Sequence, residues 1–259
     1  GRIRHRLVPR AVGLALGREV IGDGRSLGRD RLGGGALRVE HAHRVHRHTI
    51  TVVGRELITR LTALEIISVL GVGYDGIDLA AAREHGVCVT HTPGLSTEDI
   101  ADFALALLLA AAREVVKADR FVRCGEWASG RYPMTRRVSG ARLGIVGLGR
   151  IGRAVATRAL AFGMDIAYTG RTPKADVPYR WCSDARSLAA EVDFLVVCAS
   201  GGEATRALID AAVLDALGPT GVLVNIARGA IIDEEALIQA LQERRILAAG
   251  LDVFCHEPQ

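Results

Sequence analysis

The chain has 259 residues, 49% of them hydrophobic and 24% charged, which is typical of a globular protein with one large or two moderate domains. Its longest apolar run, FALALLLAAA, is too short to span a bilayer, and its five cysteines include no CxxC pair, so we expect a cytoplasmic protein with reduced thiols and no zinc site. The net charge of +4 comes from residues 1–50, where eleven arginines face four acidic residues, while the remainder carries 22 basic and 25 acidic residues.

Residues 1–48 differ in composition from the rest of the chain, because the first fifty residues have nine glycines and no Phe, Tyr, Trp or Lys. A nucleic-acid arm and a metal site are two hypotheses. We favour instead a poorly ordered segment, or a truncated or out-of-frame start, and expect no nucleic acid, membrane or metal as a partner. The metal hypothesis would use the histidines His41, His43, His46 and His48.

Residues 49–93 predict part of a smaller substrate domain. GRELITRL indicates a helix, LEIISVL a buried strand, DLAAAREHG a second helix and VCVTH a second strand. This β-loop-α-β order implies a parallel sheet. The glycine-rich turn at Val72 and Gly73 lies where such sheets bind ligands, so its N–H groups could hold a carboxylate, although a plain tight turn is equally compatible.

STEDIADFALALLLAAAREVV then predicts the most apolar helix of the chain, with Ser96 or Thr97 as its N-cap. We expect this helix to be buried between domains or subunits. The following stretch, RFVRCGEWASGRYPMTRRVSG, breaks the periodicity and contains Trp127. An arm that packs against another subunit and an active-site flap both fit it.

The stretch LGIVGLGRIGRAVATRAL indicates a dinucleotide site, and residues 94–259 are predicted to form the domain around it. Gly147, Gly149 and Gly152 have G-x-G-x-x-G spacing between a strand and a helix. The first glycine permits the tight turn, the second lets a pyrophosphate approach, and the third lets helix and strand pack closely. The helix N-terminus then faces the phosphates.

The turn TGRTPK after the second strand favours NADP(H). An acidic residue that binds the ribose 2′-hydroxyl is expected about 20 residues after the glycines, but none stands there. Arg171, Thr172 and Lys174 offer a guanidinium, a hydroxyl and an ammonium instead, which suit a 2′-phosphate. A solvated basic turn is the alternative interpretation, and NAD(H) remains possible.

Strand and helix patterns alternate to the end of the chain, which predicts an α/β fold with a doubly wound Rossmann sheet. DEEALIQALQERR is predicted as a helix with Arg244 and Arg245 in its last turn. Arg228 follows one predicted strand, and Asp252 and Glu257 follow another. All three are therefore expected at the carboxyl edge of the sheet.

With GVGYDGID, GLGRIG, VNIARGAIIDEEAL and GLDVFCHEP in this order, the chain from about Thr49 onward resembles the D-2-hydroxyacid dehydrogenase family. Through YTGRTPK it is most similar to the NADPH-preferring hydroxypyruvate, glyoxylate and hydroxyphenylpyruvate reductases. The resemblance implies a smaller flavodoxin-like domain, incomplete here, beside the Rossmann domain. It also implies a homodimer in which NADPH reduces a small 2-oxo acid to the D-2-hydroxy acid.

The resemblance assigns roles to single residues. Arg228 matches the catalytic arginine, which binds the substrate carboxylate and polarises the keto oxygen. Glu257 matches the glutamate that raises the pKa of a catalytic histidine. Val72 and Gly73 would hold the other face of the carboxylate. The implied cofactor contacts are Gly147, Leu148, Gly149, Arg150, Ile151, Gly152, Gly170, Arg171, Thr172, Lys174, Ala199, Ser200, Ile226, Ala227, Arg228 and Asp252.

The histidine itself has no match. In the family it lies in a Pro-His segment beyond the glutamate, and the sequence reaches Gln259 without one, while His85, His91 and His256 match nothing catalytic. We therefore expect the chain to lack this proton donor and to be inactive for that reason. A dinucleotide-binding regulator, an inactive gene product and an NAD-dependent dehydrogenase remain as alternatives.

Overall fold

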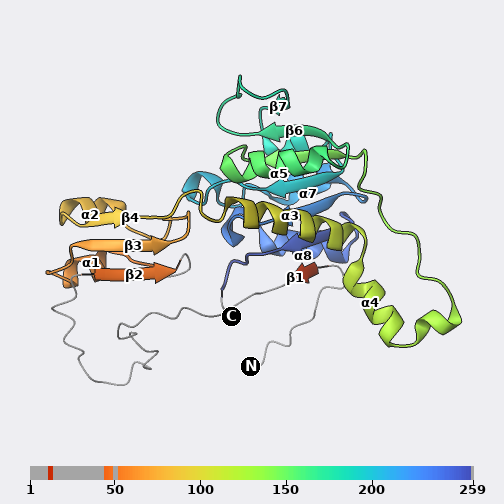
Figure 1. The fold of residues 1–259 in the computed structure, drawn as a ribbon, viewed down its shortest axis with the longest axis horizontal. Helices are drawn as coiled ribbons and strands as arrows, with labels where there is room; N and C mark the ends of the chain where they lie inside the picture. The colour runs from red at the N-terminus through yellow and green to blue at the C-terminus, as the bar shows by residue number, and fades with distance from the viewer. Residues whose placement is uncertain (1–10, 14–43, 49–51, 258–259) are drawn as a thin grey trace. The chain divides into compact units, whose positions relative to one another are not determined.

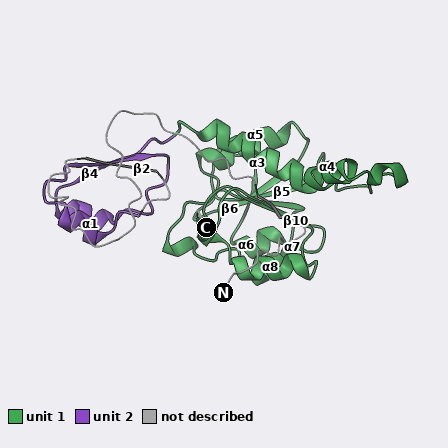
Figure 2. Cartoon of the chain, turned by 90° about the horizontal axis from the view of Figure 1, so that it is seen from below, with its two compact units in different colours: residues 1–14, 94–259 green, residues 15–93 purple. Residues whose placement is uncertain are grey.

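The computed structural model describes residues 11–13, 44–48 and 52–257. The chain divides into two compact units, one formed by residues 94–259 together with 1–14 and the other by residues 15–93 (Figure 2).

The larger unit is built on a seven-stranded sheet (Figure 1) in which every paired strand is parallel. The order β7-β6-β5-β8-β9-β10 is that of a Rossmann sheet, and β1 adds a further strand beside β10. The predicted fold class is thus confirmed. The strands are β1 (Ala11–Gly13), β5 (Arg142–Val146), β6 (Asp165–Thr169), β7 (Arg180–Cys182), β8 (Phe194–Val197), β9 (Val222–Asn225) and β10 (Ala248–Leu251).

Helices cover both faces of this sheet, as Figure 2 shows. One face carries α3 (Thr97–Ala112) and α5 (Arg150–Leu160), and the other carries α6 (Ala185–Ala189), α7 (Ala211–Leu217) and α8 (Glu234–Gln242). Each face has its own apolar core, and the strands β8 and β9 are buried along their whole length. Near-continuous apolar strands are expected for a parallel sheet covered on both sides.

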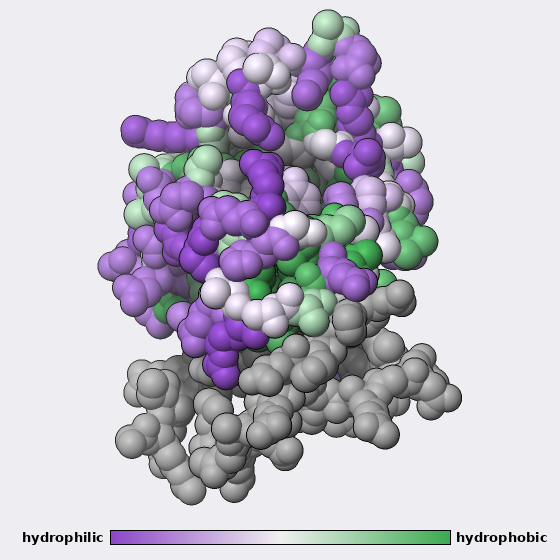
Figure 3. All heavy atoms as spheres, turned by 90° about the vertical axis from the view of Figure 1, so that its left-hand side faces the viewer, coloured by the Kyte–Doolittle hydropathy of each residue, from purple (hydrophilic) through white to green (hydrophobic). Residues whose placement is uncertain are grey.

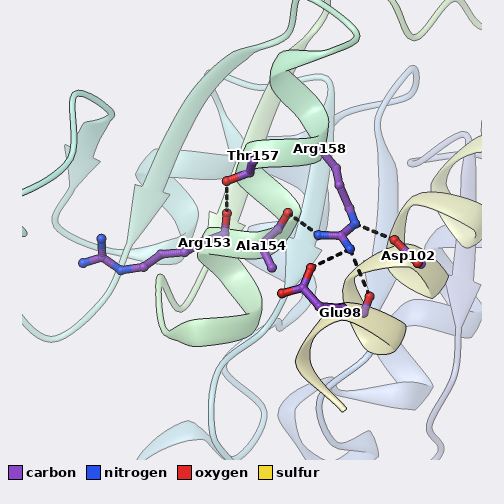
Figure 4. Close-up of polar contacts among 6 residues, drawn as sticks. All are labelled: Glu98, Asp102, Arg153, Ala154, Thr157 and Arg158. Atoms are coloured by element: carbon purple, nitrogen blue, oxygen red, sulfur yellow. Dashed lines mark hydrogen bonds and ion pairs between the residues drawn. The ribbon is translucent and has the colours of Figure 1, made fainter. Parts of the chain in front are cut away.

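The apolar helix α3, predicted to be buried between domains or subunits, lies in the core of the larger unit. Ala104, Leu108 and Ala111 are buried on its sheet-facing side. On its outer side Arg158 of α5 donates to Glu98 at 2.8 Å and to Asp102 at 2.5 Å (Figure 4). Ser96 is the N-cap residue, but its side chain makes no capping hydrogen bond.

An arm follows α3. It consists of α4 (Val115–Arg123) and the 3-10 turn η1 (Glu126–Ser129), and it projects from the rest of the unit (Figure 1). None of the residues in these two elements is buried. Glu114 joins the arm to α3 in a left-handed conformation, with φ of 49°, and accepts hydrogen bonds from Lys117 and Tyr132. Two further 3-10 turns are η2 (Glu203–Thr205) and η3 (Gly229–Ile231).

The smaller unit has a three-stranded parallel sheet in the order β2-β3-β4. Its core is formed by Val53, Ile58, Ile67, Val69 and Ala81, among others. Hydrophilic residues predominate on the face drawn in Figure 3, with small hydrophobic areas between them. Its elements are β2 (Arg44–His48), α1 (Arg55–Arg60), β3 (Ile66–Leu70), α2 (Leu79–Glu84) and β4 (Cys88–Thr90).

Several expectations need correction or lie outside the described residues. Residues 11–13 and 44–48 form strands within the segment 1–48, whose overall composition predicts poor order, because parallel pairing uses backbone groups and needs no particular side chains. Helix α8 ends at Gln242, and Arg244 lies beyond it with φ of 61°. The hypothetical metal ligands His41 and His43, and the side chains of His46 and His48, are not described.

Two further observations are limited to the described part of the chain. No helix there is long and apolar enough to cross a membrane. No group of three or more His, Cys, Asp or Glu side chains there could hold a metal ion.

Candidate active site

The turn between β5 and α5 can only be made with glycines. Gly147 has φ of 97°, and a Cβ there would lie 2.7 Å from Cα of Ala199. A Cβ on Gly152 would lie 2.3 Å from the carbonyl oxygen of Gly147, whereas a Cβ on Gly149 would meet nothing within 4 Å. The first and third glycines therefore permit close packing, and the second faces open space that a pyrophosphate could enter.

The N-terminus of α5 offers donors to that space. Its N-cap residue, Gly149, has no side chain with which to cap the helix. Among the described residues, no hydrogen-bond acceptor is found for the N–H groups of Arg150 and Ile151. Unpaired N–H groups at a helix N-terminus attract anions, so the residues present fit the pyrophosphate of a dinucleotide.

The basic turn after β6 is exposed and locally held. The side chains of Arg171, Thr172 and Lys174 are exposed and make no hydrogen bond or ion pair with the residues that the structure describes. The nearby carboxylate of Asp176 is paired with Arg153 at 3.0 Å. Two basic groups are thus available to a phosphate, and their role stays a prediction.

Arg228 is positioned by Asn225, a fully buried residue that the sequence analysis missed. The Asn225 side chain accepts a hydrogen bond from the N–H of Ala227 at 3.0 Å and donates to the carbonyl of Arg228 at 2.9 Å. Arg228 Nη1 donates to the carbonyl of Ala227 at 2.7 Å. A polar residue at the end of the apolar strand VLVN is the sequence signal that could have identified this role, since buried amides need partners.

The segment that carries Arg228 packs directly against the segment that carries Asp252 and Glu257. A Cβ on Gly229 would lie 2.0 Å from the carbonyl carbon of Phe254. Glu234, at the start of α8, accepts from the N–H of Cys255 at 2.6 Å. The sequence analysis did not identify Gly229 or Glu234 as functional, because only the fold brings the two segments together.

Asp252 and Glu257 are half-buried and lie within one turn-forming segment after β10. Burial raises the pKa of the Asp252 carboxyl, and the charge of Glu257 raises it further. Glu257 accepts a hydrogen bond from the N–H of Phe254 at 2.6 Å. His256, between them in sequence, is exposed.

The remaining predicted contacts of this unit also follow strand ends. Leu148, Ile226 and Ala227 are buried. Ala199 and Ser200 follow β8, and the Ser200 carbonyl accepts from the Thr205 hydroxyl at 2.9 Å. Burial raises the pKa of the neighbouring Cys198 thiol to about 12, which agrees with its interpretation as a small hydrophobic residue.

In the smaller unit, the glycine-rich turn after β3 is held by residues that follow β4. The Thr92 hydroxyl accepts from the N–H of Gly71 at 3.0 Å, and the N–H of Thr92 donates to the Gly71 carbonyl at 3.0 Å. The His91 ring nitrogen Nδ1 lies 3.0 Å from the carbonyl of Val72. Val72 and Gly73 thus occupy a tethered loop at the carboxyl end of their strand.

The sequence was compared with known families and proteins. The description "D-isomer specific 2-hydroxyacid dehydrogenase, NAD binding domain" belongs to the family model that matches residues 105–259. Glyoxylate/hydroxypyruvate reductase A of Arabidopsis thaliana is 47% identical over 221 residues, covering 82% of this chain and 71% of that protein. Hydroxyphenylpyruvate reductase of Plectranthus scutellarioides is 44% identical over 224 residues, covering 86% and 72%.

The chain is also similar to a solved reductase structure. The NADPH-dependent glyoxylate/hydroxypyruvate reductase of Sinorhizobium meliloti, in complex with NADP and malonate, superposes with a TM-score of 0.81 at 39% identity. The superposition covers 87% of this chain and 70% of that one.

Proposed function

Because the chain belongs to the D-isomer-specific 2-hydroxyacid dehydrogenases, we propose that it reduces a small 2-oxo acid, such as glyoxylate or hydroxypyruvate, to the D-2-hydroxy acid with NADPH. The observation that carries this proposal is the buried Asn225, which fixes Arg228 at the end of β9 on the sheet edge where the glycine turn follows β5. NADPH, when bound, supplies the hydride.

The chain's own residues would bind the substrate and position the proton donor. Arg228 would bind the substrate carboxylate and polarise the keto oxygen, a task that suits a fixed fork of N–H donors. In the smaller unit, the backbone N–H groups of Val72 and Gly73 would be donors to a carboxylate. Glu257 would stabilise, through its negative charge, the protonated imidazole of the histidine that gives its proton to the keto oxygen in this family.

The cofactor is held by three elements in this proposal. The N-terminus of α5 binds the pyrophosphate, the turn with Arg171, Thr172 and Lys174 binds the 2′-phosphate, and Asp252 contacts the nicotinamide end. NADP(H) is the preferred cofactor, and NAD(H) is the second choice. A non-catalytic regulator and an inactive product are not favoured, because the relatives described above are reductases.

The test is to follow NADPH and NADH oxidation by the purified 259-residue chain with glyoxylate and with hydroxypyruvate, and to measure cofactor binding in the same samples. We expect tighter binding of NADPH than of NADH. Turnover that Arg228→Lys reduces at least about 100-fold would support the role of the arginine, because an ammonium cannot replace a bidentate fork. Failure to bind either cofactor would refute the proposal. Binding without turnover would retain the cofactor assignment and refute the proposed reduction by this chain.

We also propose a homodimer formed through the arm of α4 and η1. On this arm Val122 and Trp127 each expose 57% of their surface, and Val115 and Val116 are exposed as well, so the arm presents several large apolar side chains that a second copy of the chain could cover. Light scattering on the wild type and on Trp127→Ser would test this, with a lighter species expected for the variant. The scattered free cysteines support a reducing, cytoplasmic location.

A further inference from the structure

The basic turn after β6 is held by a hydrogen bond to Tyr168, a residue of that strand. Tyr168 is 1% exposed, and its ring belongs to the apolar core on the face of the sheet that carries α3 and α5. Its hydroxyl accepts a hydrogen bond from the backbone N–H of Lys174 at 2.6 Å. Since the ring is fixed by packing, the hydroxyl provides a fixed attachment point for a turn whose own side chains are all in solvent.

Two further contacts hold the same turn. Trp181 of β7, the register partner of Tyr168, donates from Nε1 to the carbonyl of Gly170 at 3.3 Å. Arg153 of α5 pairs with Asp176 at 3.0 Å, and Figure 4 shows its side chain directed away from the α3 side of α5, where Arg158 binds. The turn is therefore attached at its start, its middle and its end, to three different elements.

These attachments use backbone groups and Asp176, and they leave the basic side chains available. Within the described residues, Arg171 and Lys174 have no ion-pair partner, and Asp176, the nearest carboxylate in sequence, is already engaged by Arg153. A turn whose backbone is fixed in this way loses less conformational entropy when its two cationic side chains bind a ligand.

We propose that Tyr168 is a specificity-determining positioning residue, whose hydroxyl holds the Arg171–Lys174 turn in the conformation that binds the 2′-phosphate of NADPH. This inference rests on the proposed preference for NADPH. It predicts that the hydroxyl affects ligands with a 2′-phosphate and leaves ligands without one unaffected, because the rest of the dinucleotide contacts other elements.

The experiment measures the binding of four ligands to the full chain by calorimetry: NADPH, NADH, 2′,5′-ADP and 5′-ADP. The variant Tyr168→Phe removes one oxygen atom and keeps the packed ring. Tyr179→Phe is the matched control, because Tyr179 lies in the same loop region and no hydrogen bond of its hydroxyl is found among the described residues. Trp181→Phe is a second test variant, which removes the donor to Gly170.

We expect Tyr168→Phe to weaken NADPH and 2′,5′-ADP about 5- to 10-fold, the worth of one hydrogen bond. NADH and 5′-ADP should change by less than about 2-fold, and Tyr179→Phe should match the wild type for all four ligands. Trp181→Phe should show the same selective loss as Tyr168→Phe, so the inference stays testable if the tyrosine variant does not fold.

Two results would overturn the inference alone. Equal weakening of all four ligands would mean a general structural role, and no weakening would mean that the turn keeps its conformation without the hydroxyl. A wild type that binds 2′,5′-ADP no better than 5′-ADP would instead overturn the proposed preference for NADPH, and the inference with it. The wild-type measurements thus separate the two failures.

Discussion

Replacing Gly229 by alanine is the most direct test of how the two catalytic segments are held together. The added Cβ would lie 2.0 Å from the carbonyl carbon of Phe254 and 2.3 Å from the nitrogen of Cys255. Ordinary contact begins near 3.4 Å, so one segment must move by about 1.4 Å. The atoms in the way are backbone atoms, which cannot rotate aside.

The expected loss of stability follows from the cost of overpacking, which is about 1–3 kcal/mol of unfolding free energy and sometimes more. We expect about 3 kcal/mol, because relief requires a backbone shift. For a unit of this size each kcal/mol lowers Tm by about 2–4 °C, so Tm should fall by about 6–12 °C. The shift also moves Arg228, and a misplacement of about 1 Å can reduce activity about 100-fold.

The assay is thermal unfolding followed by tryptophan fluorescence, since both tryptophans, Trp127 and Trp181, belong to the larger unit. Gly130→Ala is the matched control. Gly130 has an extended backbone with φ of 163°, and a Cβ there would meet nothing within 4 Å. Its Tm should stay within about 2 °C of the wild type. A Gly229→Ala protein that is equally stable would show that the two segments do not pack as described.

Three other substitutions test the electrostatics and the hydrogen bonds of the larger unit. Burial and the charge of Glu257 raise the pKa of Asp252. Its carboxyl therefore favours folding while it is protonated, and this contribution to the free energy of unfolding is lost as the pH rises through the folded pKa. Asp252→Asn should therefore raise Tm at pH 7, with a gain that vanishes below about pH 4; an equal gain at every pH would contradict this. The pKa of Asp193 is lowered, chiefly by hydrogen bonds from Arg142, so its contribution is present above its unfolded pKa and is lost as the pH falls through the folded value. Asp193→Asn should lower the free energy of unfolding, measured in urea, by about 1–3 kcal/mol at pH 7 and by much less near pH 3. A decrease that does not depend on pH would argue against the ion pair. Asn225→Ala leaves two backbone groups without their partner and should cost about 2–4 kcal/mol while reducing kcat/KM more than NADPH affinity; a parallel loss of both would indicate general unfolding.

The sequence predicts well those features that repeat with a local period or need a special backbone. The glycines of GLGRIG and the apolar strands belong to this class, and the fold class follows from the alternation of strands and helices. Asp78 and Asp233 both cap their helices through a side-chain hydrogen bond. Such signals lie within a few residues of each other, so no tertiary information is required.

Contacts between distant segments could not be predicted in this way. The packing of Gly229 on Phe254, the bond between Glu234 and Cys255 and the tether from Tyr168 all depend on which strand ends meet. The sequence identifies the residues that would touch a ligand, but not the residues that hold them. The sequence pattern predicts Tyr168 only as part of a strand, because its hydroxyl binds a turn whose backbone conformation the local pattern does not predict.

The pairing of β1 with β10 has a consequence for how the protein is made. Residues 11–13 are synthesised before the smaller unit, whereas their partners, residues 249–251, are synthesised after it. The smaller unit lies between them in the sequence and can fold before β1 pairs with β10 at the edge of the larger sheet. Pairing β1 with β10 requires a contact between segments far apart in the sequence, which makes it a slow, late event in folding.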